Sequence, residues 1–301
     1  MRLFRIFKFI FTPGLNRILS RLLRPFVRLI PARYQFPVTG FFKVKIDDNT
    51  SFYIEGHLTS YITRLCFWQG IKGFEYDSVK IFCGLIKHMH VFFDIGANVG
   101  YYSLLAASIN DKLNVTAFEP FQDAGAALKS NVAYNGFNHI RIEETALSDK
   151  TGDATLYYTI NRDFPGYKYQ LGGKNSLIDP ENRLTGKIVV KTITLDDYAV
   201  QKGIDEISLI KLDTEATEYF ILKGAEKLIQ RCRPIIQCEV LTGFYEDKLE
   251  GLLLRLGYVF YRVEKDGLCL QNSLQQPQKH KNDYFFIPRA KEHLVKRFMV
   301  Q

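Results

Sequence analysis

The sequence predicts an α/β fold whose sheet is mostly parallel and carries an antiparallel edge strand. Short apolar runs that end in an acidic residue alternate with segments of helical spacing, and this alternation is typical of parallel sheets covered by helices. Near the end of the chain, the apolar runs at residues 258–263 and 283–287 can pair as an antiparallel edge. The acids that end the predicted parallel strands are Asp94, Glu119, Asp213 and Glu239.

The first of these strands leads into a glycine-rich turn. Val91–Phe93 suggests a buried strand, and helical spacing begins at Tyr101. Between them, Gly96 and Gly100 let the backbone turn sharply. Asn98 stands where dinucleotide-binding enzymes have a glycine, so the backbone there cannot approach a pyrophosphate as closely. This substitution disfavours an NAD-dependent enzyme.

The acids predict which ligand this turn binds. Asp94 lies at the strand tip facing the turn, where it would repel a phosphate but suits a cation or an amino acid. S-adenosyl-L-methionine carries both an ammonium and a sulfonium. Glu119 follows Gly100 by nineteen residues, near the separation of ~20 at which nucleotide-binding folds place a carboxylate on the ribose hydroxyls. We therefore expect S-adenosyl-L-methionine at Asp94, Gly96, Asn98, Gly100 and Glu119.

Five short motifs follow one another along the chain: Asp94–Tyr101, Ala117–Pro120, Ala146–Asp149, Thr194–Asp197 and Lys211–Glu215. In this order they resemble the FkbM family of S-adenosylmethionine-dependent methyltransferases, over roughly residues 70 to 288. The resemblance implies a Rossmann-like class I methyltransferase fold. It also implies that Ala146 and Leu147 flank the adenine base.

Methylation of a hydroxyl requires a base, because a hydroxyl is a poor nucleophile until its proton leaves. We favour Asp213 or Glu215, which follow a central strand beside the first motif's strand, where open α/β sheets bind ligands. Glu239 and His139 are alternatives. A cluster of these carboxylates could instead hold a divalent metal, although no spacing signature for a metal site is present. We expect Glu218 to stabilise the start of a helix.

One position departs from the family's pattern. The family's motif resembles Asp-Val-Glu-Gly, whereas Glu215 is followed here by Ala216. The additional side chain is expected to narrow the site or to restrict its backbone. Because Asp213 and Glu215 of the motif are both present, we expect an active enzyme. The alternative is a catalytically inactive scaffold that binds S-adenosylmethionine at a membrane.

The positive charge of the chain is concentrated at its N-terminus. Residues 1–33 contain eight Lys and Arg and no acid, which leaves 32 basic against 32 acidic residues in the remainder. A neutral body offers no surplus charge for nucleic acid, so we expect a small-molecule or glycan acceptor instead. The five cysteines form no C-x-x-C pair, which favours a reducing cytoplasm over a disulfide framework or a zinc ribbon.

The leader at residues 1–33 is predicted to be a basic amphipathic helix from Leu15 to Ile30, bent at Pro25, with arginines opposite an apolar face. Its uncharged runs are shorter than the ~20 apolar residues that span a bilayer. Two interpretations remain. The leader either anchors the protein peripherally on an anionic membrane surface, or packs on its own or a partner's domain.

Four parts of the chain are expected. They are the extension at residues 1–33, a cap region at 34–84 above the ligand end of the sheet, the methyltransferase domain at 85–290 and a basic tail at 291–301. Inside the domain, the loop from Asn161 to Arg183 is longer than usual connections, so it either binds the acceptor, which we expect, or is disordered. Stacking faces and hydroxyls suited to a sugar are offered in and beside this loop by Tyr157, Tyr158, Tyr167, Tyr169, Asn175 and Ser176. The predicted activity is O-methylation of a sugar, glycolipid or polyol-like natural product.

Overall fold

The computed structural model describes residues 13–164, 167, 170–171, 173–179, 185–274 and 283–300, without the side chains of Pro13, Arg28 and Arg33. The first twelve residues of the predicted leader, and Tyr169 of the predicted acceptor segment, lie outside this part of the chain.

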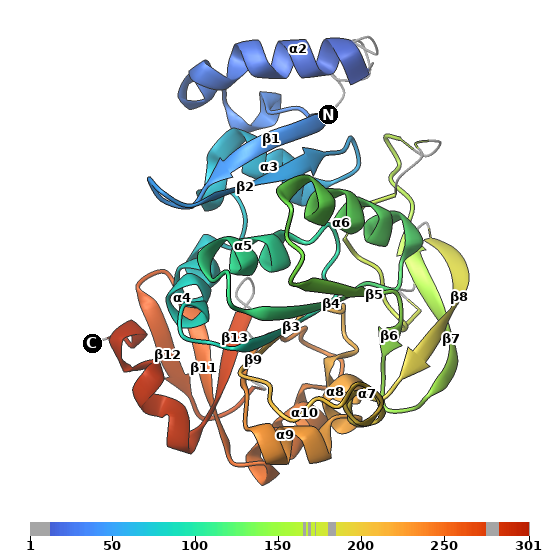
Figure 1. Ribbon diagram of the computed structural model, residues 1–301, viewed down its shortest axis with the longest axis vertical. Coiled ribbons are helices and arrows are strands. Elements are labelled where there is room, and N and C mark those ends of the chain that lie inside the picture. The colour runs from blue at the N-terminus through green and yellow to red at the C-terminus, as the bar shows by residue number, and fades with distance from the viewer. Residues whose placement is uncertain are drawn as a thin grey trace.

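An eight-stranded sheet runs through the centre of the molecule (Figure 1). Five neighbouring strands are parallel, and the three at the other end pair antiparallel with them and with each other. The predicted α/β fold with an antiparallel edge is confirmed. In spatial order, the strands are β12 (Gly267–Gln271), β11 (Tyr258–Glu264), β13 (Asp283–Pro288), β10 (Ile235–Glu239), β9 (Leu209–Leu212), β3 (Val91–Ile95), β4 (Asn114–Phe118) and β5 (Ile140–Glu143).

Helices cover both faces of this sheet, because consecutive apolar residues of each strand point to opposite sides. On β3, Phe92 belongs to the core beneath α4 (Tyr76–Ile86), α5 (Tyr101–Ile109) and α6 (Gln122–Asn135). Phe93 belongs to the core on the other face. That face is covered by α7 (Leu195–Lys202), α8 (Glu218–Lys223), α9 (Glu226–Cys232) and α10 (Glu246–Arg255).

Two details of the sheet and its helices differ from the predicted pattern. β12 was not predicted, since its five residues carry too short an apolar signal. The single helix expected from Glu215 to Arg231 is instead α8 and α9, separated at Gly224. A Cβ at Gly224 would lie 2.2 Å from the carbonyl oxygen of Ser148, so tertiary packing requires glycine where a continuous helix would prefer another residue.

The predicted hairpin is formed by β1 (Gly40–Lys45) and β2 (Ser51–Gly56), followed by α3 (Tyr61–Gln69) and a 3₁₀ turn, η4 (Gly70–Lys72). The hairpin lies on α5 and α6, where the side-chain oxygen of Asn131 accepts a 2.7 Å hydrogen bond from the Glu55 N–H. Tyr61 and Ile62 of α3, and Phe74 and Glu75 before α4, line a cavity at the ligand end of the sheet. The proposed domain boundaries stay predictions.

The N-terminal helix packs on this hairpin. α2 (Pro13–Leu23) continues into a 3₁₀ helix, η2 (Arg24–Leu29), so the helix changes at Pro25 as predicted. Asn16 is fully buried, donating to the carbonyl oxygen of Pro37 at 2.9 Å and accepting from the Thr39 N–H at 2.8 Å. Arg24 donates to the Lys43 carbonyl oxygen at 2.7 Å.

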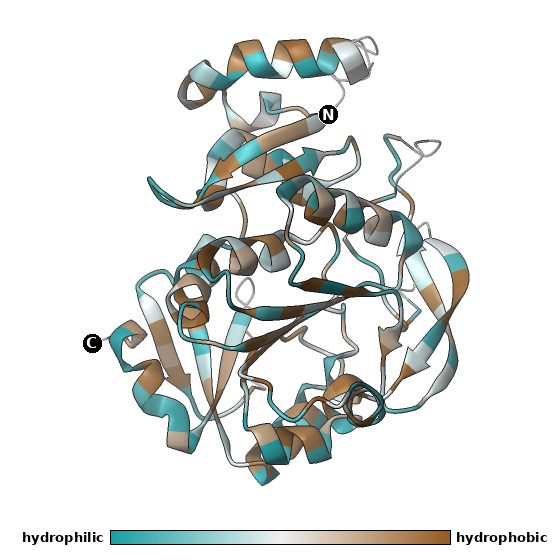
Figure 2. Cartoon of the chain, in the orientation of Figure 1, coloured by the Kyte–Doolittle hydropathy of each residue, from teal (hydrophilic) through white to brown (hydrophobic). Residues whose placement is uncertain are grey.

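The predicted amphipathic pattern is confirmed on α2, although Arg24 of the following turn packs on the hairpin. In Figure 2, apolar (brown) and polar (teal) residues alternate along this helix. One half of the apolar side, comprising Leu19, Leu23, Val27 and Ile30, packs on the protein, and the other half remains in solvent. This exposed stripe consists of Leu15, Ile18, Leu22, Phe26 and Leu29, which are 37, 58, 63, 57 and 79% exposed. Among the described residues, no helix combines the length and apolarity needed to cross a membrane.

A small second sheet lies beyond β5 and is formed by β6 (Ala146–Leu147), β8 (Thr185–Ile193) and β7 (Gly152–Thr159). The described part of the segment between β7 and β8 is tied to the loop between β2 and α3 by the hydrogen bond from the Leu171 N–H to the Thr59 hydroxyl, at 3.1 Å. At the end of the chain, η5 (Arg289–Leu294) and η6 (Lys296–Phe298) follow β13, with Val295 completely buried.

Candidate active site

The glycine-rich turn between β3 and α5 is held against the end of β4. The N–H groups of Gly96 and Ala97 both donate to the carbonyl oxygen of Phe118 at 3.0 Å. Gly96 has a φ of +79°, and a Cβ there would lie 2.0 Å from the carbonyl oxygen of Asp213. Because both the left-handed conformation and this close approach exclude a side chain, only glycine fits.

Asn98 and Gly100 continue the turn in the left-handed region, at φ of 52° and 87°. Gly100 directly precedes α5. A Cβ at Gly100 would lie 2.3 Å from the side chain of Leu128, so glycine is needed here for the turn to pack against α6. Asn98 borders the cavity beneath the turn, and its side-chain oxygen is buried without a hydrogen-bond partner among the described residues. That oxygen can accept a hydrogen bond from a ligand.

Glu119 directly follows β4 and joins this turn to the second motif. Its Oε2 accepts a 2.7 Å hydrogen bond from the Asn98 N–H, and its Oε1 accepts one of 2.9 Å from the Phe121 N–H. Each carboxylate oxygen can accept another hydrogen bond. Burial raises the pKa of Glu119 to about 7, although both backbone hydrogen bonds oppose the increase.

A cavity opens at the C-terminal ends of β3 and β4, beside β6. We call it the first lobe. The predicted cofactor residues Gly96, Asn98, Glu119, Ala146 and Leu147 all line it. Ala146 and Leu147 are buried and apolar, which suits the face of an adenine, while the spare accepting capacity of Glu119 suits ribose hydroxyls. The residues present therefore fit S-adenosylmethionine.

A second cavity of about 300 Å³ adjoins the first lobe and shares Gly96, Asn98 and Asp213 with it. This volume is within the range of small-molecule sites. Tyr61 and Phe74 contribute aromatic wall, and Lys174 also lines the cavity. We call it the acid lobe, because its walls include the carboxyl groups of Glu75, Asp94, Asp213, Glu215 and Glu239.

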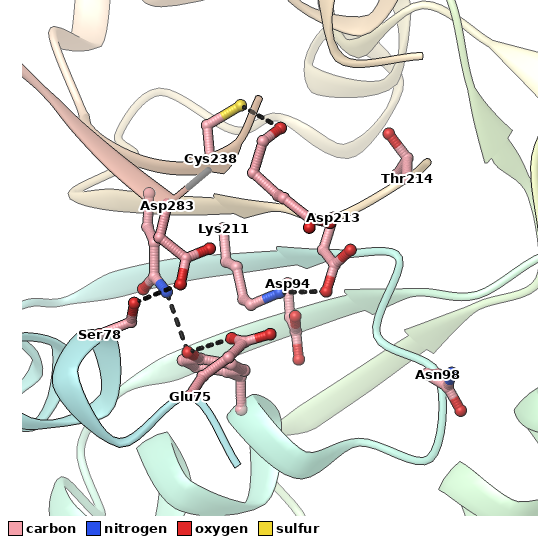
Figure 3. Close-up of polar contacts among 12 residues, drawn as sticks. Glu75, Ser78, Asp94, Asn98, Lys211, Asp213, Thr214, Cys238 and Asp283 are labelled. Atoms are coloured by element: carbon pink, nitrogen blue, oxygen red, sulfur yellow. Dashed lines mark hydrogen bonds and ion pairs between the residues drawn. The ribbon is translucent and has the colours of Figure 1, made fainter. Parts of the chain in front are cut away.

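The register of the sheet explains why these acids meet. Asp94 pairs with Lys211 on the neighbouring strand, and Glu239 pairs with Asp283. Asp213 follows the pair Leu212 and Cys238, so it ends beside Glu239. Since aligned residues of neighbouring strands point to the same face, their side chains gather on one side of the sheet (Figure 3).

Lys211 is the cation of this cluster. Its side chain is only 5% exposed, and its Nζ donates to Oδ2 of Asp213 at 2.9 Å. The amine also lies 4.5 Å from the centroid of the Tyr102 ring. Burial opposes the charge of Lys211, but the surrounding carboxylates, above all that of Asp213, outweigh it and raise the pKa of the amine above its ordinary value.

Burial raises the pKa values of two acids of the lobe. Burial, followed by the charges of Asp213 and Glu215, raises the pKa of Glu239 to about 9. Burial likewise raises the pKa of Glu75 to about 8, against the charge of Lys211. Glu75 also accepts a 2.8 Å hydrogen bond from the Tyr102 hydroxyl. Glu75 lies in the wall of the lobe.

Asp94 lies deeper in the cluster. Its side chain accepts a 2.6 Å hydrogen bond from the Ser103 hydroxyl, and burial raises the pKa of Asp94. It lines the acid lobe and not the first lobe.

The turn after Asp213 is strained. Glu215 and Ala216 both have left-handed backbones, at φ of 54° and 79°. The Ser176 hydroxyl donates to the carbonyl oxygen of Glu215 at 2.6 Å and so ties the turn to the segment between β7 and β8. Ala216 thus adopts the conformation that the family's glycine would favour. Glu218 accepts hydrogen bonds of 2.9 Å from the N–H and hydroxyl of Thr214, in agreement with a structural role.

The segment that was expected to bind the acceptor reaches both lobes, and its role stays a prediction. Gly173, Asn175 and Ser176 line the first lobe, and Leu171, Gly173 and Lys174 line the acid lobe. The described tyrosines between residues 157 and 167 line neither lobe; Tyr158 stacks on Phe121 with ring centroids 4.8 Å apart. The expectation that His139 could serve as the base is wrong. His139 precedes β5 and lines a different cavity, at the N-terminal edge of the sheet, so it cannot act as the base.

Sequence reasoning passed over Lys211, although its position before Asp213 on a buried strand was a usable signal. In the part of the chain that the structure describes, no three His, Cys, Asp or Glu side chains are arranged to hold a metal ion.

Comparison with known proteins agrees with this geometry. The Methyltransferase FkbM domain family matches residues 94–260, more than half of the chain. The 2-O-methyltransferase NoeI of Sinorhizobium fredii is 28% identical over 208 residues, covering 65% of this chain and 83% of that enzyme. The 31-O-demethyl-FK506 methyltransferase FkbM of Streptomyces tacrolimicus is 32% identical over 155 residues, covering 45% of this chain and 59% of that enzyme.

Among solved structures, the methyltransferase FkbM of Methylobacillus flagellatus superimposes with a TM-score of 0.43 at 15% identity, over 65% of this chain and 43% of that one. The family match carries more weight, since it includes the glycine-rich turn together with Glu119, Asp213 and Glu239. The chain is therefore an S-adenosylmethionine-dependent methyltransferase that belongs to the FkbM family.

Proposed function

We propose that the protein methylates a hydroxyl group of a sugar, glycolipid or polyol-like natural product. The observation that carries this proposal is the acid lobe, which adjoins the first lobe through the shared wall of Gly96, Asn98 and Asp213. Carboxyl groups accept hydrogen bonds from several hydroxyls at once, and aromatic side chains such as Tyr61 and Phe74 suit the apolar face of a sugar ring.

When bound, S-adenosylmethionine supplies a methyl group carried on a sulfonium. The task of this chain's residues is to hold the acceptor oxygen opposite the departing sulfur and to remove its proton. Asp213 is the preferred base, because it lines both lobes and is hydrogen-bonded to the buried Lys211. Glu215 and Glu239 line the acid lobe as well and are the alternatives.

The activities of two relatives support oxygen as the acceptor atom, since NoeI is a 2-O-methyltransferase and FkbM acts on 31-O-demethyl-FK506. The rival function is an inactive scaffold, suggested by Ala216. Against it, Ala216 adopts the left-handed conformation expected of glycine, and the neighbouring Glu215 still lines the lobe.

The experiment is a transfer assay with a radiolabelled methyl donor against glycan, glycolipid, nucleic-acid and protein fractions of the source cell. We expect label in the glycan or glycolipid fraction, in a bond that resists the alkaline hydrolysis that cleaves methyl esters. Label confined to nucleic acid or protein would contradict the proposal. Tight binding of the donor without transfer to any fraction would favour the scaffold.

We also propose that the protein is cytoplasmic and associates peripherally with an anionic membrane surface through residues 1–33. The support is the exposed stripe on α2 and η2, which includes Ile18, Leu22 and Leu29 at 58, 63 and 79% exposure. Helical geometry places Arg17 and Arg21 beside this stripe. A basic helix with an exposed apolar stripe suits the interface of an anionic bilayer, where a lipid-linked acceptor would lie.

A further inference from the structure

Lys211 is unusual because it buries a charge in the middle of the main sheet. It lies on β9, and its whole residue is 4% exposed. A lysine at such a position costs several kcal/mol unless its charge is compensated. Yet its amine makes one hydrogen bond to protein among the described residues, to Oδ2 of Asp213, although three donors are present.

The other carboxylates near Lys211 have partners elsewhere. Asp94, beside it on β3, accepts from the Ser103 hydroxyl at 2.6 Å. Glu75 accepts from the Tyr102 hydroxyl at 2.8 Å, and Asp283 on β13 accepts from the Ser78 hydroxyl at 2.7 Å. The lysine amine therefore reaches along its own strand to the single acid that lines both lobes.

This arrangement leaves the two oxygens of Asp213 unequal. Oδ2 is occupied by the amine of Lys211, which in turn lies over the ring of Tyr102. No hydrogen bond to protein involves Oδ1 among the described residues. Glu239 and Glu215 flank the carboxyl group from β10 and from the following turn, but neither is a cation. Lys174 also lines the acid lobe, but Lys211 is the cation that is hydrogen-bonded to Asp213 in the part of the chain that the structure describes.

We propose that Lys211 is a positioning residue, which holds Oδ2 of Asp213 so that Oδ1 faces the acceptor hydroxyl and receives its proton. This inference rests on the proposed function. In the step itself, the acceptor O–H bond breaks and its proton passes to Oδ1. The oxygen forms the bond to the methyl carbon while the electron pair of the carbon–sulfur bond stays on sulfur. The carboxyl group then returns its proton to water.

The test compares three variants. Lys211→Met removes the charge at similar length, Lys211→Arg keeps a charge, and Lys223→Met is the matched control. Lys223 forms an ion pair of the same geometry, 2.8 Å from Oδ2 of Asp149, but its side chain is 46% exposed and lines neither lobe.

We expect Lys211→Met to lower kcat by ~10²-fold or more while the Kd of the methyl donor changes little. Lys211→Arg should recover part of the lost kcat, because its guanidinium can still donate to Oδ2 of Asp213. Lys223→Met should match the parent chain in every measurement.

A second measurement does not depend on turnover. The carboxyl carbon of Asp213 can be followed by ¹³C NMR in labelled protein and assigned by its loss in Asp213→Asn. Its chemical shift at a fixed pH should change in Lys211→Met and stay unchanged in Lys223→Met. An unchanged chemical shift in Lys211→Met, or a Lys211→Met variant with the kcat of the parent chain, would overturn the role of Lys211. Failure of the parent chain to methylate any hydroxyl would instead count against the proposed function alone.

Discussion

The main-chain N–H of Asn98 and the carboxylate of Glu119 form a 2.7 Å hydrogen bond across two separate motifs of the chain. Glu119 thereby holds the glycine-rich turn in place while keeping capacity to accept from a ligand. The same carboxylate thus fixes the wall of the first lobe and can accept a hydrogen bond from the ligand bound there.

Replacing Glu119 by Ala should weaken the binding of S-adenosylmethionine by about ten- to a hundred-fold, because a hydrogen bond to a charged group contributes ~1.5–3 kcal/mol. Isothermal titration calorimetry measures the change. Glu144→Ala is the control, since that side chain is 51% exposed and pairs only with Lys129. Equal affinity of Glu119→Ala and the parent chain would rule out the ribose contact.

The amide variants of the three candidate bases should separate binding from chemistry. We expect Asp213→Asn to keep its affinity for the cofactor while turnover falls by ~10²–10⁴-fold, since general base catalysis contributes that much. Glu215→Gln and Glu239→Gln are measured in the same assay. Full activity of both Asp213→Asn and Glu215→Gln would transfer the role to Glu239.

Glu239 should make the free protein less stable as the pH rises. Its pKa is raised from 4.5 to about 9 by folding, so the folded chain holds this proton more tightly than the unfolded chain. The resulting stability is complete below the unfolded value and is lost as the pH rises through about 9. We therefore expect Glu239→Gln to flatten the decrease of Tm across this interval.

Asp205→Asn is the control for that measurement, because the Asp205 side chain is 93% exposed. A decrease of Tm that is equally steep in Glu239→Gln and the parent chain would show that another group causes it.

Ala216→Gly should stabilise the protein. The φ of 79° at Ala216 is strained for a residue with a side chain, so glycine should add about 1 kcal/mol to the free energy of unfolding. Ala225→Gly provides a control of opposite sign, because Ala225 has an ordinary φ of −123° and is completely buried. Chemical denaturation measures both. A loss of stability in Ala216→Gly would mean that the methyl group packs favourably enough to outweigh the strain.

The exposed stripe of the N-terminal helix should mediate binding to anionic vesicles. Truncation before Tyr34 would also uncover the hairpin, so we prefer Ile18→Gln combined with Leu22→Gln and Leu29→Gln. Sedimentation with phosphatidylserine vesicles should show strong loss of binding, with salt weakening what remains.

Val189→Gln with Val200→Gln is the matched control for the vesicle assay, since these residues are 74 and 81% exposed on other elements. If the parent chain does not bind anionic vesicles at low salt, the exposed stripe must instead pack against a protein surface.

The sequence predicted the first lobe well because its signals are local. Glycines at a turn, an apolar strand before it and an acid after the next strand can all be read within about thirty residues. The acid lobe depends on which strands become neighbours. Lys211 could be assigned to the site only once the pairing of β9 with β3 was known, because this pairing brings it beside Asp94.

The error at His139 could have been avoided, because residues that precede a parallel strand lie at the opposite edge from those that follow it. The partial burial of the apolar side of α2 could not be predicted from the sequence. Helical spacing alone could not show that Leu19 and Leu23 would be buried by the hairpin while Ile18 and Leu22 stayed in solvent.

The acid lobe is assembled from two different stretches of the chain. Tyr61, Phe74 and Glu75 precede the region that matches the family, while Asp213 and Glu239 lie inside it. The wall of this lobe can therefore change at residues 61–75 while the residues of the first lobe stay the same. We expect redesign of residues 61–75, together with Leu171 and Lys174 of the same lobe, to change which acceptor the enzyme methylates.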